Sequence, residues 1–153
     1  MLKAIYIILS LLHSTFIFSQ EKDMLFSLCD DGKTYPYYYP ELEYKGGFWE
    51  IKQHFVMDYP MEQFQALNNN TGILTVKFNV NCKGETGDFS LQFCDFNYHA
   101  IKINQEIIDY LLNKTKTLDN WIPGQDEEGN VVNSHKFFSF RIKEGVLLEI
   151  LPK

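Results

Sequence analysis

Residues 71–93 read TGILTVKFNVNCKGETGDFSLQF, and this stretch decides the fold. Apolar and polar residues alternate on both sides of a short polar break, which is the pattern of a β-hairpin with one buried face. If Cys82 faces Gly87 across the turn, the apolar residues of both strands meet on one face. The expected pairs are Val80 with Phe89, Phe78 with Leu91 and Val76 with Phe93. The other face carries Thr75, Lys77, Asn79 and Asn81, so we expect one face toward solvent and one toward a helix layer.

The hairpin also restricts how the three cysteines, Cys29, Cys82 and Cys94, can pair. In the predicted register Cys94 lies opposite Thr75, more than about 20 Å from Cys82 and on the opposite face. A disulfide needs Cα atoms within about 7 Å of each other. A Cys82–Cys94 bridge is therefore excluded, and any disulfide must use Cys29. Three reduced thiols remain the alternative.

Two further segments show helical spacing. The apolar residues of FWEIKQHFVM (48–57) recur every three to four positions, which predicts a short helix after Gly46 and Gly47 that stops before Pro60. Residues 103–118 carry a broader apolar stripe and predict a second helix with Asn104 as its N-cap. Both helices have one apolar face, so each can pack on the buried face of the sheet.

The segment KFFSFRIKEGVLLEI (136–150) predicts a second hairpin, for which two turn lengths compete. A two-residue turn puts Glu149 opposite Phe140 on the apolar face. A three-residue loop instead pairs Ile142 with Val146, Phe140 with Leu148 and Phe138 with Ile150, and it gives Gly145 the positive φ. We predict the three-residue loop. The expected fold class is α+β, with an antiparallel sheet of three to four strands and two helices packed on one face.

The N-terminus has the order of a secretory signal peptide. Lys3 precedes an apolar run from Ala4 to Leu12, and a small residue, Ser19, ends the segment. The run is about 15 residues long at most, whereas a membrane-spanning helix needs about 20. We therefore expect cleavage after Ser19, a periplasmic or secreted protein and no stable membrane span. Residues 20–45 predict an extended Tyr/Pro-rich lead-in with a short edge strand, followed by one domain over residues 46–153.

The composition excludes several functional classes. With 45% hydrophobic and 16% aromatic residues, the chain has enough apolar material for a packed core, so it is not a disordered protein. The formal net charge is −6, and it becomes −7 without residues 1–19, where Lys3 is the only charged residue. An acidic surface without a basic stripe repels phosphate backbones, so we expect no nucleic-acid partner.

The sequence contains no recognisable catalytic constellation. The three histidines outside the signal segment, His54, His99 and His135, have no metal-ligand spacing with each other or with a cysteine. We therefore expect no catalytic residues, no cofactor and no metal. The alternative is a small secreted enzyme or metal-binding protein that uses His99, His135 and the acidic loop from Asp126 to Glu128.

Several short motifs follow one another in a distinctive order. Gly46 and Gly47 precede the first helix, and Tyr59 and Pro60 end it. The hairpin then runs from Thr71 and Gly72 through Val76, Phe78 and Val80 to Gly84. Trp121, Pro123 and Gly124 come before the last core strand near Phe138 and Phe140. This order, over roughly residues 40–142, resembles the C-terminal domain of the TonB family of Gram-negative periplasmic proteins.

The resemblance implies three antiparallel strands with two helices on one face. In that family the last core strand has a free edge, here Phe138, Phe140 and Ile142, that binds a short peptide of outer-membrane transporters as an added strand. The chain departs from TonB itself by a short lead-in where TonB has a long proline-rich spacer. It also has an extra predicted strand, residues 146–151, on the same edge, which would leave binding to another edge or to the lead-in.

The resemblance implies an exported, non-enzymatic protein-interaction module of the periplasm or outer membrane, linked to TonB-type transport. The expected partner is a protein of the cell envelope. A third hypothesis is a structural subunit that forms a homodimer through its strand edges.

Overall fold

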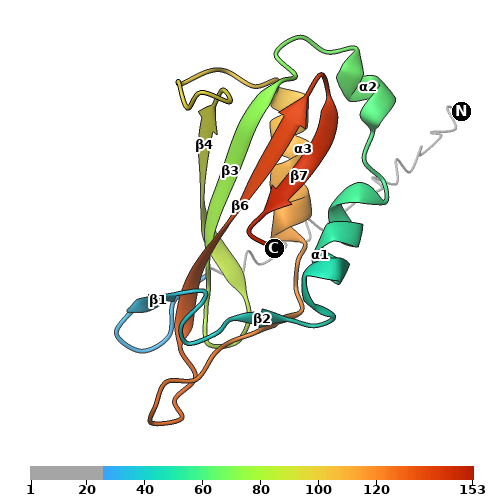
Figure 1. Cartoon of the computed structure of the whole chain (residues 1–153). Helices are drawn as coiled ribbons and strands as arrows, with labels where there is room; N and C mark the ends of the chain where they lie inside the picture. Colours follow the sequence, from blue (N-terminus) through green and yellow to red (C-terminus); the bar gives the residue numbers. More distant parts are fainter. Residues whose placement is uncertain (1–25) are drawn as a thin grey trace, which may run out of the picture.

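The computed structural model of the chain describes residues 26–153 (Figure 1). The predicted signal peptide, residues 1–19, lies outside the described residues. The helices are α1 (Gly47–Val56), α2 (Met61–Gln65) and α3 (Gln105–Lys116). The strands are β1 (Thr34–Pro36), β2 (Glu43–Tyr44), β3 (Gly72–Val80), β4 (Thr86–Cys94), β5 (Trp121–Ile122), β6 (Asn133–Lys143) and β7 (Val146–Leu151). Within the described part of the chain, no helix is long and apolar enough to cross a membrane.

The main sheet confirms the α+β class and corrects the predicted strand arrangement. The described residues form a five-stranded sheet in the order β1-β6-β3-β4, with β7 also paired to β6. Most pairs are antiparallel, but β1 runs parallel to β6, so the sheet is mixed. Two-residue strands β2 and β5 form a second, small sheet. The short edge strand expected in the lead-in is present as β1, whereas β2 and β5 escaped sequence analysis because strands of two residues carry no measurable alternation.

Helices α1 and α3 cover one face of the main sheet (Figure 1). The predicted alternation of β3 is confirmed, because Leu74, Val76, Phe78 and Val80 are buried while Lys77 is exposed. Asn104 caps α3 as predicted, since its side chain accepts the backbone N–H of Glu106 at 3.0 Å. The core formed between these layers includes Ile51 and Phe55 of α1, Ile107 and Leu111 of α3, and Phe138, Phe140 and Ile142 of β6.

The predicted register of the first hairpin is wrong, although the buried face is right. The turn takes residues 81–85, where the carboxamide oxygen of Asn81 accepts the backbone N–H groups of Lys83 and Glu85, each at 3.0 Å. Val80 therefore pairs with Thr86. A β-bulge between Lys77 and Asn79 then restores the alternation. Beyond the bulge, Val76 pairs with Leu91 and Leu74 with Phe93, and Cys94 lies opposite Ile73.

The predicted three-residue loop of the second hairpin is also wrong. The turn is Glu144-Gly145, with φ of 51° and 76°, and Lys143 pairs with Val146. Two-residue hairpin turns with positive φ at both positions match the twist of the flanking strands. A bulge at Leu148 then brings Ile150 opposite Phe140, so the apolar face is kept without the longer loop. Leu148 itself is exposed.

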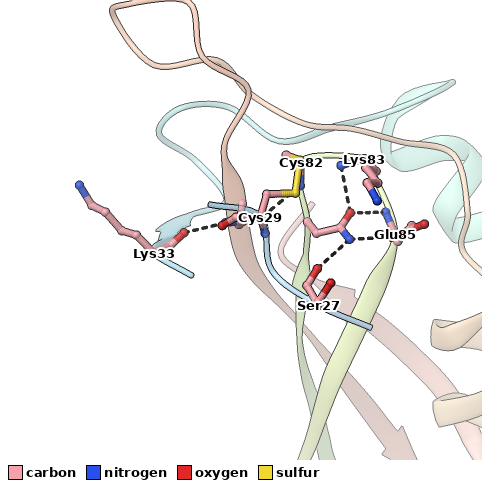
Figure 2. Close-up of a disulfide and its surroundings, with 8 residues drawn as sticks. Ser27, Cys29, Lys33, Cys82, Lys83 and Glu85 are labelled. Carbon is pink, nitrogen blue, oxygen red and sulfur yellow. Dashed lines mark hydrogen bonds between the residues drawn. A yellow bond between two sulfur atoms is a disulfide. The ribbon is translucent and has the colours of Figure 1, made fainter. Parts of the chain in front are cut away.

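The lead-in is tied to the sheet by a disulfide between Cys29 and Cys82, with Cα atoms 6.0 Å apart (Figure 2). The expectation that any disulfide uses Cys29 is confirmed, and Cys94 is free among the described residues. The bridge joins the segment before β1 to the turn between β3 and β4. It therefore holds β1 in place beside the start of β6.

Candidate interaction site

The edge of β6 that the family resemblance predicts to bind peptide is covered by the chain itself. Strand β7 pairs with Ser139 to Lys143, and β1 pairs with Asn133 to His135. Phe140 and Ile142 thus have strands on both sides, and Phe138 lies in the short interval between β1 and β7. All three side chains are fully buried. The expectation that residues 146–151 form an extra strand on this edge is confirmed.

The long open edge of the sheet is instead the outer side of β4. The backbone N–H of Asp95 donates away from β3 to the carbonyl oxygen of His99, at 2.9 Å. Because backbone groups of a strand alternate in direction, the N–H and C=O groups of Phe89 and Leu91 also point away from β3. No other described segment bonds to these two residues on that side. They form a ready template for a further strand.

The apolar side chains of β4 are only partly covered by the rest of the described protein. Phe89, Leu91 and Phe93 contact the core but are only partly buried, and Ile101 continues the same apolar surface. Natural edge strands are commonly protected by lysine or proline. Strand β4, TGDFSLQFC, has neither, and Asp88 is its one charged residue. An added strand would cover these half-buried rings.

A groove of about 720 Å³ adjoins the end of this edge. Its lining includes Leu91 and Phe93 of β4 and Tyr98 and Ile101 of the following loop. It also includes residues on the sheet face away from the helices, among them Thr75, Gln92 and Ser139. Tyr98 is 80% exposed, so a partner can contact its ring without rearrangement of the loop. The groove also reaches Arg141, whose guanidinium lies 5.3 Å from the ring centroid of Phe96. Leu91 therefore belongs both to the open backbone edge of β4 and to the lining of the groove.

The alternative metal site fails on geometry. His135 pairs with Asn79 at one end of the β3–β6 ladder. His99 is held at the other end, because its backbone N–H donates to Asp95, next to Cys94, which pairs with Ile73. Six residues of extended strand separate the two ends by about 20 Å. One ion cannot bind both histidines, and residues 26–153 contain no cluster of three His, Cys, Asp or Glu side chains able to hold a metal.

The acidic loop has a structural explanation of its own. The carboxylate of Asp126 accepts the backbone N–H groups of Asn130 at 2.8 Å and Glu128 at 3.0 Å. These bonds, those from Asn130 first, lower the pKa of Asp126. The third histidine, His54, is likewise occupied, since its Nε2 lies 2.8 Å from the carbonyl oxygen of Lys114. The Asp126 carboxylate thus stabilises a turn, and the His54 ring is bonded to the backbone near the C-terminal end of α3.

The residues that carry the family resemblance hold the scaffold together. A Cβ atom on Gly84 would lie 2.7 Å from the carbonyl oxygen of Trp121, and one on Gly124 would lie 2.7 Å from that of Glu41. Both glycines therefore allow segments to approach closely. Tyr59 donates its hydroxyl to the carbonyl oxygen of Gly145, at 3.0 Å. The other motif residues lie at the ends of helices and strands: Gly46 and Gly47 begin α1, Pro60 precedes α2, Gly72 begins β3, and Pro123 follows β5.

Sequence analysis missed two features. It did not identify β4 as the open edge, although the lack of lysine and proline in residues 86–94 was a usable signal. It also passed over Lys136, which occupies an inward position of β6 in series with Phe138 and Phe140. A lysine among the inward-facing apolar residues of a strand is unusual, so the sequence pattern alone could have identified it.

Searches against protein-family models, curated proteins and solved structures find no match to this chain. The resemblance to TonB C-terminal domains therefore stays a prediction from the order of the sequence motifs.

Proposed function

We propose that this protein is a non-enzymatic interaction module that binds an extended segment of a partner protein as an added strand on β4. The single observation that carries this proposal is the outward backbone of Phe89 and Leu91, which has no partner within residues 26–153 and lies beside half-buried apolar rings. Strand addition uses such backbone groups for affinity and alternate side chains for specificity. The bound segment is expected to be apolar at alternate positions, so that it covers Phe89, Leu91 and Phe93.

The proposed place of action is the periplasm or outer membrane, and the proposed partner is an envelope protein. The signal-like N-terminus supports export. The Cys29–Cys82 disulfide supports an oxidising compartment. The motif order shared with TonB C-terminal domains supports a link to TonB-type transport, with β4 in place of the covered β6 edge.

The test is a proline substitution at Leu91. Its N–H points away from β3, so Leu91→Pro removes an outward donor and blocks an added strand while leaving the β3 ladder intact. Leu91→Val is the matched control, since it keeps the N–H and an apolar side chain. The probe is a library of random decapeptides displayed on phage and selected on residues 20–153.

Selected peptides should bind the wild type and Leu91→Val alike and lose at least about tenfold in affinity on Leu91→Pro. They should also slow hydrogen exchange at the amides of Phe89 and Leu91. Peptides that bind Leu91→Pro as tightly as the wild type, or a selection that yields none, would reject the β4 site. A wild-type dimer that Leu91→Pro converts to a monomer would favour the homodimeric structural subunit instead.

A further inference from the structure

Lys136 is a buried lysine in the first half of β6, on the side of the sheet that faces the helices. It is 9% exposed and lies two residues before Phe138, which is fully buried. Across the ladder it pairs with Phe78, another core residue. Lysines are almost never this buried unless they are paired with a counter-charge.

Within residues 26–153, no carboxylate forms an ion pair with this lysine. No carboxylate oxygen lies within 4.0 Å of Lys136 Nζ, and no side-chain hydrogen bond involves this nitrogen. Its neighbours are aromatic: Nζ lies 4.0 Å from the ring centroid of Tyr37, 5.4 Å from Phe138 and 5.8 Å from Trp121. Burial lowers the pKa of Lys136 to about 8. The rings attract the ammonium group but do not neutralise it.

The ammonium group faces an accessible cavity of about 680 Å³. The lead-in, the small β2–β5 sheet, the start of α1 and the end of the chain surround this cavity. Aromatic side chains form much of its wall, namely Tyr37, Tyr38, Tyr44, Phe48, Trp121 and Phe138. The volume falls within the range of small-molecule sites, which combine apolar walls with a few polar groups. Here the buried polar group is Lys136.

The charges around the cavity limit the kind of ligand. Glu41, Glu43, Lys45 and Lys153 line it together with Lys136. The two glutamates and the other two lysines offset each other in charge, so the ammonium group of Lys136 is left to balance one negative charge of a ligand. The aromatic wall favours a planar or cyclic apolar body. A monoanion with such a body satisfies both conditions.

We propose that this cavity binds a small carboxylic acid with a planar or cyclic apolar body. The carboxylate pairs with the ammonium group of Lys136, and the body contacts the rings of Tyr37 and Trp121. The site is independent of the β4 edge, because β3 separates β4 from β6.

The experiment compares phenylacetate with phenylacetamide, which has the same shape without the charge. Each is titrated at pH 7 into the full chain lacking residues 1–19, and NMR follows the signals of Lys136, Tyr37 and Trp121. Phenylacetate should bind at least about tenfold more tightly than the amide and should raise the pKa of Lys136. Lys136→Met, which keeps the stem, should lose this preference, and Lys136→Arg should retain much of it.

Lys77→Met is the matched control, since Lys77 is an exposed lysine on the other face of the same sheet. It should bind phenylacetate like the wild type. Equal affinity for the acid and the amide, unchanged binding by Lys136→Met, or no change at the three reporter residues at millimolar phenylacetate would each overturn the proposal. The β4 proposal would stand in all of these cases, because Leu91 variants do not touch this cavity.

Discussion

The side-chain amide of Asn133 bonds both backbone groups of Cys29: its Oδ1 accepts the N–H at 2.9 Å, and its Nδ2 donates to the carbonyl oxygen at 3.1 Å. The same oxygen accepts the N–H of Cys82 at 3.2 Å, and the same nitrogen donates to the carbonyl of Lys33 at 3.0 Å. Figure 2 labels three of the residues bonded to Asn133, namely the disulfide cysteines Cys29 and Cys82 and the nearby Lys33. One buried residue of β6 therefore joins both cysteines to the sheet.

Replacing Asn133 should destabilise the protein through these four bonds. We expect Asn133→Ala to lower the free energy of unfolding by about 2–3 kcal/mol, because it leaves several backbone groups without partners. Urea denaturation measures this change. Asn120→Ala is the control, since exposed Asn120 bonds through its side chain only to Asp119, and its effect should stay within about 0.5 kcal/mol. Equal effects of the two substitutions would show that the network contributes little.

Removing the disulfide should also cost stability. The bridge closes a loop with a sequence separation of 53 residues, which corresponds to about 4 kcal/mol of unfolded-state entropy. We expect Cys29→Ser with Cys82→Ser to lower the free energy of unfolding by about 2–4 kcal/mol. Reduction of the wild type with a dithiol should have a similar effect. Cys94→Ser, which breaks no bridge, should change stability much less, and a comparable loss there would contradict this interpretation.

Replacing each of the two tryptophans by alanine should change the stability of the fold by very different amounts. Trp121 is 5% exposed, contacts Phe78 and Phe138, and donates its Nε1–H to the carbonyl of Leu118. We expect Trp121→Ala to destabilise the fold by about 3–5 kcal/mol, as for other large core aromatics. Trp49, on the surface of α1, is 64% exposed, and Trp49→Ala should have little effect. Thermal unfolding compares them, and a native-like midpoint for Trp121→Ala would refute the core assignment.

Lys136 should make stability increase with pH. Its pKa of about 8 in the folded state lies below the ordinary lysine value of 10.5, so the folded protein loses this proton first. Between these two values the unfolded state binds more protons, and the free energy of unfolding rises with pH. The expected gain from pH 7 to 9.5 is about 2 kcal/mol.

Lys136→Met should lack this increase and should be more stable than the wild type at pH 7, on the order of 2 kcal/mol. Urea denaturation at each pH gives the difference between the two proteins, from which the other titrating groups cancel. Lys77→Met should follow the wild-type curve. Parallel curves for the wild type and Lys136→Met would mean that Lys136 keeps an ordinary pKa.

Local alternation predicted most of the core correctly. Val76, Phe78 and Val80 were assigned to the buried face, and they remain there although the register is shifted. A bulge in each hairpin absorbs the difference, because placing a charged residue such as Glu149 on the apolar face would cost more than one irregular residue. Register is therefore less predictable than the face to which each residue belongs.

The amino-acid sequence by itself determined the types of the longer helices and strands, the buried faces, the extra strand on β6 and the exclusion of a Cys82–Cys94 bridge, because these follow from spacing along a short segment. Only the tertiary structure decided that β4 is open and that Lys136 is buried with no carboxylate within 4.0 Å among residues 26–153. These features depend on where distant segments meet: Tyr37 and Trp121 reach Lys136 from separate parts of the chain. Such encounters result from the packing of the whole domain, which local periodicity does not encode.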